Sequence, residues 1–195
     1  AYQTRGQAAF LFGRVSNTGF WNYYLACLLL KLSPALLALP AVWLLRRGWT
    51  RGQAFQTAGV LIPAVVLVAI ASANRIQIGL RYALPAVALL AVPAALAAVR
   101  RPWLGAALGL WTALASLGAH PDYLAYFNPL AGRDGWRRLS DANVDWGQDL
   151  TSLRDFVRAS GADEVVLSYY GATLSEAVGF PFQDLWSFGV WGDKP

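Results

Sequence analysis

The sequence predicts a mainly α-helical fold of polytopic membrane helices, with about four spans, followed by a small extracytoplasmic α/β segment. Composition is the first reason, because 56% of the 195 residues are apolar and only 14% are charged. Soluble globular proteins average about 45–50% apolar and about 25% charged residues. The second reason is a charge asymmetry. Residues 1–121 carry ten basic side chains and no carboxylate, whereas residues 122–195 carry all eleven carboxylates and six basic side chains.

Long apolar runs in the first part of the chain are the third reason. A bilayer core of about 30 Å needs about 20 helical residues, with a range of about 17–25. The runs predict spans at 23–45, 58–73, 82–99 and 103–119. The second and fourth runs are short, and we expect them to extend into flanking residues.

The arginines between the runs predict the orientation of the spans. Two links on one side carry five of them: Arg46, Arg47, Arg51, Arg100 and Arg101. The other side carries four over a longer stretch: Arg5, Arg14, Arg75 and Arg81. Cytoplasmic loops carry the excess of Lys and Arg. We therefore expect a multi-pass protein of the inner (plasma) membrane, with 1–22, 74–81 and 120–195 extracytoplasmic. Because these bases punctuate apolar runs and form no polar face, nucleic acid is not an expected partner.

A lysine interrupts the first predicted span. Lys31 lies about eight residues from the outer end of that run, and a charge at the bilayer centre costs about 2.5–3.5 kcal/mol on an insertion scale. Two interpretations remain open. Either Lys31 faces an anionic lipid head group, or the span is shifted and Lys31 lies at the membrane interface.

Residues 120–195 predict short elements outside the membrane. The apolar residues Tyr123, Tyr126, Phe127 and Leu130 follow helical spacing and predict an interfacial helix. A second helix is expected from about Leu150 to about Ala159, with Leu150, Leu153, Phe156 and Val157 inward, a capping box formed by Asp145 and Gln148, and Gly161 as its stop. A strand is expected over 164–170.

Three carboxylates recur every four residues in this region: Asp141, Asp145 and Asp149. On one continuous helix they could bind a divalent cation. Gly147 interrupts such a helix, and the alternative is that these residues cap helices and form turns. His120 is the only histidine, so no histidine-based metal site or Ser-His-Asp triad can form from this chain alone. We therefore assign no metal ligand and no cofactor.

Three stretches carry distinctive motifs: residues 74–85 (NRIQIGLRYALP), 120–132 (HPDYLAYFNPLAG) and 141–150 (DANVDWGQDL). They resemble the N…IGxRYxLP, HPxYLxYFNxLAG and DSNxDWGQDL stretches of bacterial integral-membrane glycosyltransferases. The resemblance covers most of residues 10–170 and is to the C-superfamily members related to protein O-mannosyltransferases and aminoarabinose transferases. Ala142 replaces a usual serine, and Pro129 stands where an acid is common. The motif residues with no assigned role are Asp141, Asn143, Asp145, Trp146, Gln148 and Asp149.

The resemblance implies the C-terminal portion of an enzyme that transfers a sugar from a polyprenyl-phosphate-linked donor on the outer face of the membrane. It also implies that the catalytic aspartate lies in a first outer loop upstream of this segment. No carboxylate occurs in residues 1–121 to act as a membrane-proximal general base. We therefore assign no catalytic residue to this chain and expect it to be inactive by itself.

Donor-phosphate binding is the role that these residues could supply. Arginine binds phosphate through a bidentate fork, and Arg81 and Arg75 lie on the predicted outer link. His120 and Lys31 are weaker candidates for the same anionic site. The alternative for the two arginines is interfacial anchoring.

Two other functions remain open. Prolines within the spans and Lys31 are also compatible with a transporter module, although the sequence shows no convincing internal repeat. A membrane-anchored extracytoplasmic binding or assembly protein is the other alternative. The acceptor, whether protein, lipid or glycan, is not predicted.

Overall fold

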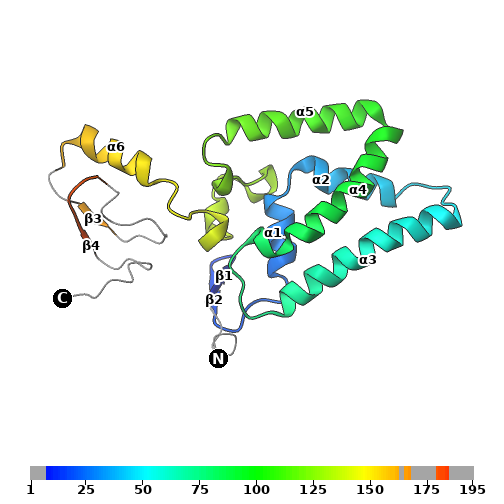
Figure 1. Cartoon of the computed structure of the whole chain (residues 1–195), viewed down its shortest axis with the longest axis horizontal. Helices are drawn as coiled ribbons and strands as arrows, with labels where there is room; N and C mark the ends of the chain where they lie inside the picture. The colour runs from blue at the N-terminus through cyan, green and yellow to red at the C-terminus, as the bar shows by residue number, and fades with distance from the viewer. Residues whose placement is uncertain (1–7, 163–164, 168–178, 185–195) are drawn as a thin grey trace. The chain divides into compact units, whose positions relative to one another are not determined.

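The computed structural model of the chain describes residues 8–162, 165–167 and 179–184. Its described part is mainly helical (Figure 1). The α-helices are α1 (Tyr23–Lys31), α2 (Pro34–Leu44), α3 (Arg51–Ala73), α4 (Leu84–Arg100), α5 (Pro102–Gly118) and α6 (Leu150–Ser160). The strands are β1 (Ala9–Leu11), β2 (Arg14–Ser16), β3 (Val165–Leu167) and β4 (Phe182–Asp184). Single 3₁₀ turns are η1 (Leu80–Ala83), η2 (Tyr123–Ala125), η3 (Pro129–Ala131), η4 (Gly135–Arg137) and η5 (Asp141–Asn143). The chain forms two compact units, Ala1–Asn143 and Val144–Pro195.

The first predicted span is broken into two helices. α1 ends at Lys31, α2 begins at Pro34, and their axes differ by 107°. Proline disfavours helical backbone at the residue before it, and Ser33 is extended, with ψ 149°. The Ser33 hydroxyl then accepts a hydrogen bond from the Leu36 amide at 3.4 Å and caps α2. The predicted span over 23–45 is therefore not one straight helix, and the pair forms a broken span or a re-entrant loop.

Among the described residues, two helices are long and apolar enough to cross a membrane, and a third crossing is available if α1 and α2 form one bent span. The two are α3, with 23 residues, and α4 together with η1, with 21 residues (Leu80–Arg100). α3 begins seven residues before the apolar run at 58, as expected for a short run. Its first turn is held by a capping box between Thr50 and Gln53. α5 has 17 residues and is about 26 Å long at about 1.5 Å per residue, so the fourth span stays a prediction.

The first unit places its loops at two ends of the helices. In Figure 1, β1, β2 and the segments that lead into α4 and out of α5 gather at the left of this unit, and the α2–α3 and α4–α5 links lie at its right. Near the left end, a core cluster is built from α1, β1, η1 and η3 around Tyr23, Tyr24 and Leu139. A second cluster packs α2 against α4 and α5 and includes Trp43 and Ala97. We name the two ends the loop end and the arginine end, after the segments they carry.

The predicted interfacial helix over 123–130 does not form. Its residues lie in the two short turns η2 and η3. Pro129 has no N–H to donate, and the Asn128 side chain accepts from the Leu130 amide at 3.0 Å, which turns the backbone at this point. The helical spacing of the aromatic residues was misleading because Asn128 faces the interior.

In the second unit, the described residues form one helix and a pair of strands. α6 ends at Gly161, which has the left-handed conformation that favours glycine (φ 65°). This confirms the expected helix and its stop. Val157 is buried as expected, but Phe156 is 68% exposed in the structure. β3 pairs in parallel with β4, which confirms the expected strand over 165–167; its predicted ends at 164 and 168–170 lie outside the described residues.

Candidate functional site

The three motif segments meet α1 at the loop end, and Asn143 lies where they join. Its side-chain oxygen accepts from the Leu80 amide at 3.0 Å, and the Cys27 thiol lies 3.9 Å from the same oxygen. Its amide nitrogen donates to the Tyr23 hydroxyl at 3.0 Å and to the Ser140 carbonyl at 3.2 Å. Asn143 is 1% exposed. All of its donors and acceptors are thus used within the fold, which identifies it as a structural cross-link between α1, η1 and the 140–143 segment.

Lys31 forms a second cross-link at the end of α1. Its ammonium donates to the carbonyls of Asn143, at 2.6 Å, and Leu124, at 2.7 Å. It also lies 4.1 Å from the centroid of the Phe127 ring. The Lys31 side chain therefore links α1 to the 120–132 and 141–150 motif segments, through two backbone carbonyls and the face of an aromatic ring.

Asn128 closes the broken end of α1. Its amide nitrogen donates to the carbonyls of Leu29 (2.6 Å) and Leu32 (2.8 Å), and its backbone N–H donates to the Leu30 carbonyl (2.9 Å). The last carbonyls of a helix have no partner within the helix. Asn128 supplies these partners at the point where the chain turns by 107°.

Gln77 holds the segment that precedes α1. Its side-chain oxygen accepts from the Phe20 amide at 2.7 Å, and its nitrogen donates to the Phe20 carbonyl at 2.8 Å. Gly19 beside it has φ 83°, and a Cβ there would lie 3.0 Å from the Gln77 side chain. Gln77 therefore pairs with the backbone of Phe20 much as a neighbouring strand would.

Arg81 and Asp141 lie on adjoining turns. The Gly79 backbone packs so closely against Ala142 that a Cβ at Gly79 would lie 3.2 Å from the Ala142 methyl group. Burial raises the pKa of Asp141, while its hydrogen bond from the Ala142 amide (2.7 Å) and the charge of Arg81 act in the opposite direction. The Arg81 guanidinium also lies 5.2 Å from the Tyr82 ring centroid. Arg81, one of the predicted phosphate ligands, therefore lies close enough to Asp141 to affect the pKa of that carboxyl group.

Arg75 and His120 are both exposed at the loop end. Arg75 follows the last turn of α3, and His120 follows α5. One ring nitrogen of His120 lies 3.0 Å from the Tyr123 hydroxyl. Both side chains are accessible to a ligand at this end of the helices.

The second half of the DANVDWGQDL motif belongs to the other unit, which begins at Val144. The expected capping box does not form. The Asp145 carboxylate instead accepts from the Gly147 amide at 2.7 Å, and Gln148 bonds the Trp146 amide and the Val144 carbonyl. Asp149 occupies the N-cap position of α6. Asp145 therefore forms a turn rather than a helix cap.

The three motif aspartates lie on separate local structures. Asp141 is in η5, Asp145 is in the turn, and Asp149 precedes α6. Within residues 8–162, 165–167 and 179–184, no group of three His, Cys, Asp or Glu side chains is placed to hold a metal ion.

Sequence reasoning missed the roles of Asn128 and Gln77. Both lie inside the motif stretches and are almost fully buried, at 1% and 2% exposed. The available signal was a single amide side chain within an otherwise apolar or aromatic stretch. A buried amide that satisfies several backbone groups is a frequent reason for such a residue.

Comparisons with protein-family models, with curated proteins and with solved structures found no match to this chain.

Proposed function

We propose that this chain is the donor-binding part of a membrane glycosyltransferase that uses a polyprenyl-phosphate-linked sugar. The sugar transfer would take place at the loop end, on the outer face of the inner (plasma) membrane, with 120–195 extracytoplasmic. The two or three membrane-length helices fit a lipid-linked substrate, because such a donor stays in the bilayer and presents its phosphate at the surface.

One observation carries this proposal. The segments 74–85, 120–132 and 141–143, which resemble glycosyltransferase motifs, lie together on α1 through Asn143 and Lys31. Motif segments that lie tens of residues apart in the sequence are best explained by one shared site when they form one local structure. The junction they form is rigid, since its buried amides are fully hydrogen-bonded.

Phosphate recognition would fall to the exposed cations around this junction. Arg81 is the first candidate and Arg75 the second, with His120 beside them. A guanidinium can bind two phosphate oxygens at once. Lys31 has two of its ammonium protons bound to carbonyl oxygens, so its part in the proposal is to hold the junction and to add positive potential.

The break between α1 and α2 gives little support to a transporter. Broken helices in transporters present unwound backbone carbonyls to ions. Here the carbonyls of Leu29, Leu30 and Leu32 accept hydrogen bonds from Asn128. The carbonyl groups at the break are thus already hydrogen-bonded within the chain and are not free to bind an ion.

Binding of a polyprenyl phosphate to the purified chain tests the proposal. We expect the phosphate to bind at least tenfold more tightly than the corresponding polyprenol, which has the same tail without the charge. Arg81→Gln should weaken binding of the phosphate by at least tenfold, since a charge-assisted bidentate contact contributes roughly 1.5–3 kcal/mol.

Arg14→Gln is the matched control. Arg14 is an exposed arginine on β2, also at the loop end, and lies outside the three motifs. Its replacement should leave the affinity within twofold of the parent chain. Equal binding of polyprenol and polyprenyl phosphate, or equal losses in both variants, would contradict a phosphate site at Arg81.

A further inference from the structure

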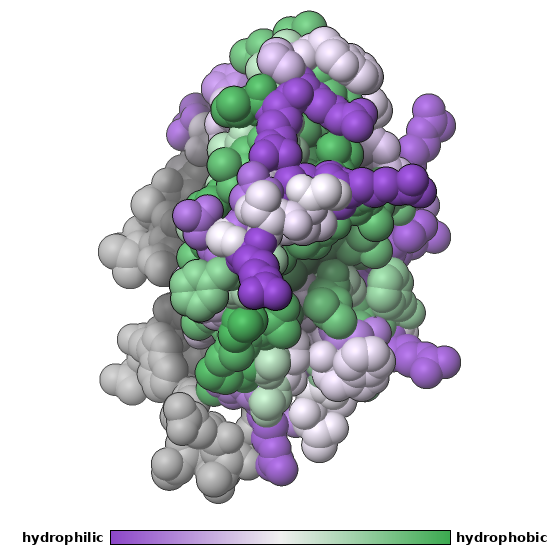
Figure 2. All heavy atoms as spheres, turned by 90° about the vertical axis from the view of Figure 1, so that its right-hand side faces the viewer, coloured by the Kyte–Doolittle hydropathy of each residue, from purple (hydrophilic) through white to green (hydrophobic). Residues whose placement is uncertain are grey.

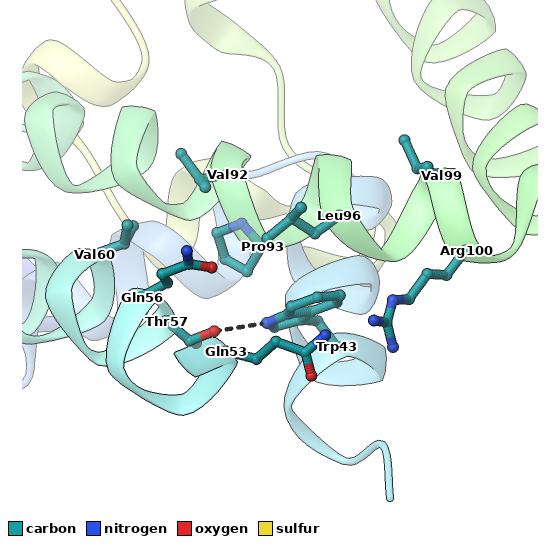
Figure 3. Close-up of a pocket in the computed structure, with 10 residues that line it drawn as sticks. All are labelled: Trp43, Gln53, Gln56, Thr57, Val60, Val92, Pro93, Leu96, Val99 and Arg100. Atoms are coloured by element: carbon teal, nitrogen blue, oxygen red, sulfur yellow. Dashed lines mark hydrogen bonds between the residues drawn. The ribbon is translucent and has the colours of Figure 1, made fainter. Parts of the chain in front are cut away.

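The arginine end holds a cavity that the proposed sugar transfer does not use. It has a volume of about 430 Å³ and lies between α2, α3 and α4 (Figure 3). Ligand pockets typically measure about 300–1,000 Å³. Its lining residues are Trp43, Gln53, Gln56, Thr57, Val60, Val92, Pro93, Leu96, Val99 and Arg100.

The cavity is polar toward the arginine end and apolar farther along the helices. α3 runs away from the arginine end, so its lining residues pass from Gln53 and Gln56 to Val60. α4 runs toward that end and passes from Val92 to Arg100. Eight helical residues span about 12 Å. An occupant of this length, lying along the helices, meets a charged group at one end and aliphatic side chains at the other.

Two arginines contact aromatic rings here: Arg100 lines the cavity, and Arg46 lies beside it against the lining residue Trp43. The Arg46 guanidinium lies 4.1 Å from the Trp43 ring centroid and 4.0 Å from that of Trp49. Arg100 lies 5.0 Å from the same Trp43 ring. Trp43 is itself fixed, because its indole N–H donates to the Thr57 hydroxyl at 3.0 Å, as the dashed line in Figure 3 marks. The two positive charges are therefore held near each other before any ligand arrives.

Neither Arg46 nor Arg100 forms an ion pair within the described residues. Residues 8–121 contain no Asp or Glu, and the one ion pair among the described residues joins Arg154 to Asp155 in the other unit. The Arg46 Nη2 atom donates to the Gln53 amide oxygen at 2.8 Å, but its Nε atom is buried with no hydrogen-bond partner in the described part of the chain. Such a group indicates a missing acceptor.

The surface at the arginine end mixes basic and apolar side chains, as a membrane interface does. Figure 2 looks onto the arginine end and shows hydrophilic side chains spread beside hydrophobic ones. Arg47 and Arg101 are exposed on the same links, next to Arg46 and Arg100. Basic pockets between membrane helices on the cytoplasmic side bind the head groups of anionic lipids.

We infer that this cavity binds an anionic phospholipid of the surrounding bilayer. Its phosphate lies at Arg100 and Arg46, and part of an acyl chain lies along Val60, Val92 and Leu96. The apolar end of the cavity distinguishes this ligand from a free anion, and the two arginines, which form no ion pair within the described residues, distinguish it from a zwitterionic lipid.

Native mass spectrometry of the full chain in detergent tests the inference with three probes: phosphatidylglycerol, phosphatidylcholine and inorganic phosphate. We expect phosphatidylglycerol to be retained at least tenfold better than phosphatidylcholine. Inorganic phosphate should not displace it at equal concentration. Retention of both lipids alike, or displacement by phosphate alone, would overturn the assignment of an anionic phospholipid.

The neighbouring arginines supply matched controls. Arg100→Gln and Arg46→Gln should each lower retention of phosphatidylglycerol by about tenfold. Arg101→Gln and Arg47→Gln remove the same charge from the same links and should change it less than twofold. Equal losses in all four variants would show that overall charge, rather than this cavity, attracts the lipid.

A variant at the apolar end of the cavity keeps the test possible if the arginine variants fail to fold. Val92→Trp retains every charge and fills the part of the cavity assigned to the acyl chain. It should lower retention at least fivefold, while its elution volume on size exclusion stays that of the parent chain. A folded Val92→Trp chain that retains phosphatidylglycerol fully would overturn the inference.

Discussion

Removal of the Asn143 side chain should loosen the junction of the three motif segments, and Cys27 provides a direct way to measure this. Cys27 is the only cysteine in the chain, is fully buried and lies 3.9 Å from the Asn143 side-chain oxygen. A maleimide can reach its thiol only when the junction opens. The labelling rate in detergent therefore reports the free energy of opening.

The expected magnitude follows from the groups that Asn143→Ala leaves unpaired. The Leu80 amide loses its acceptor, and the Tyr23 hydroxyl, in a side chain that is 1% exposed, loses its donor. Each buried polar group left unpaired costs about 1–3 kcal/mol. A total of about 3 kcal/mol corresponds to labelling that is roughly 100-fold faster, since about 1.36 kcal/mol gives a factor of ten.

Two variants separate hydrogen bonding from simple access. Asn143→Leu fills a similar volume without polar groups and should label about as fast as Asn143→Ala, because the same partners remain unpaired. Asn17→Ala removes an exposed asparagine of the same unit and should label like the parent chain. The reasoning is refuted if Asn143→Ala labels within threefold of the parent, or if Asn143→Leu restores slow labelling.

Three further changes test the same end of the molecule. Lys31→Met removes two hydrogen bonds to backbone carbonyls and should speed Cys27 labelling at least tenfold, because each charged hydrogen bond contributes roughly 1.5 kcal/mol or more. Labelling at the parent rate would contradict this role. Gly135→Ala would place a Cβ too close to the Phe127 ring for the packing to accommodate, and it should lower the thermal unfolding midpoint in detergent by the equivalent of about 1–3 kcal/mol. A change in midpoint no larger than that of an unrelated surface variant would count against this packing. Burial raises the folded-state pKa of Asp141, so its stabilising contribution is complete below its unfolded-state pKa and is lost as pH rises through the folded value. Asp141→Asn, which keeps the acceptor for the Ala142 amide, should therefore raise the unfolding midpoint at pH 7 and flatten its fall with rising pH; a parallel pH profile would refute this.

Local sequence signals predicted the helices well because they are carried by neighbouring residues. α6 ends at Gly161, and α3 and α4 lie on two of the apolar runs. Hydropathy fails where a single residue redirects the chain. Pro34 breaks the first run, and Asn128 prevents the helix expected over 123–130.

The candidate site was predictable as a set of segments but not as a geometry. Arg81 and Arg75 stand out by charge on an apolar background, and their proposed role in phosphate binding stays a prediction. The capping box at Asp145 failed because the side chains of both of its members bond within the turn instead. Asn143 was noticed as part of a motif, and only its partners revealed that it joins three segments.

The sequence by itself determined that this chain is rich in apolar helices, which residues form them, and that positive charge without carboxylates fills the region around them. These properties depend on composition and on spacing over a few residues. Tertiary structure alone decided the 107° break, the buried amides and the cavity at the arginine end. The physical reason is distance along the chain: Asn128 and Asn143 find their partners 99 and 120 residues away, and no local pattern encodes such a pairing.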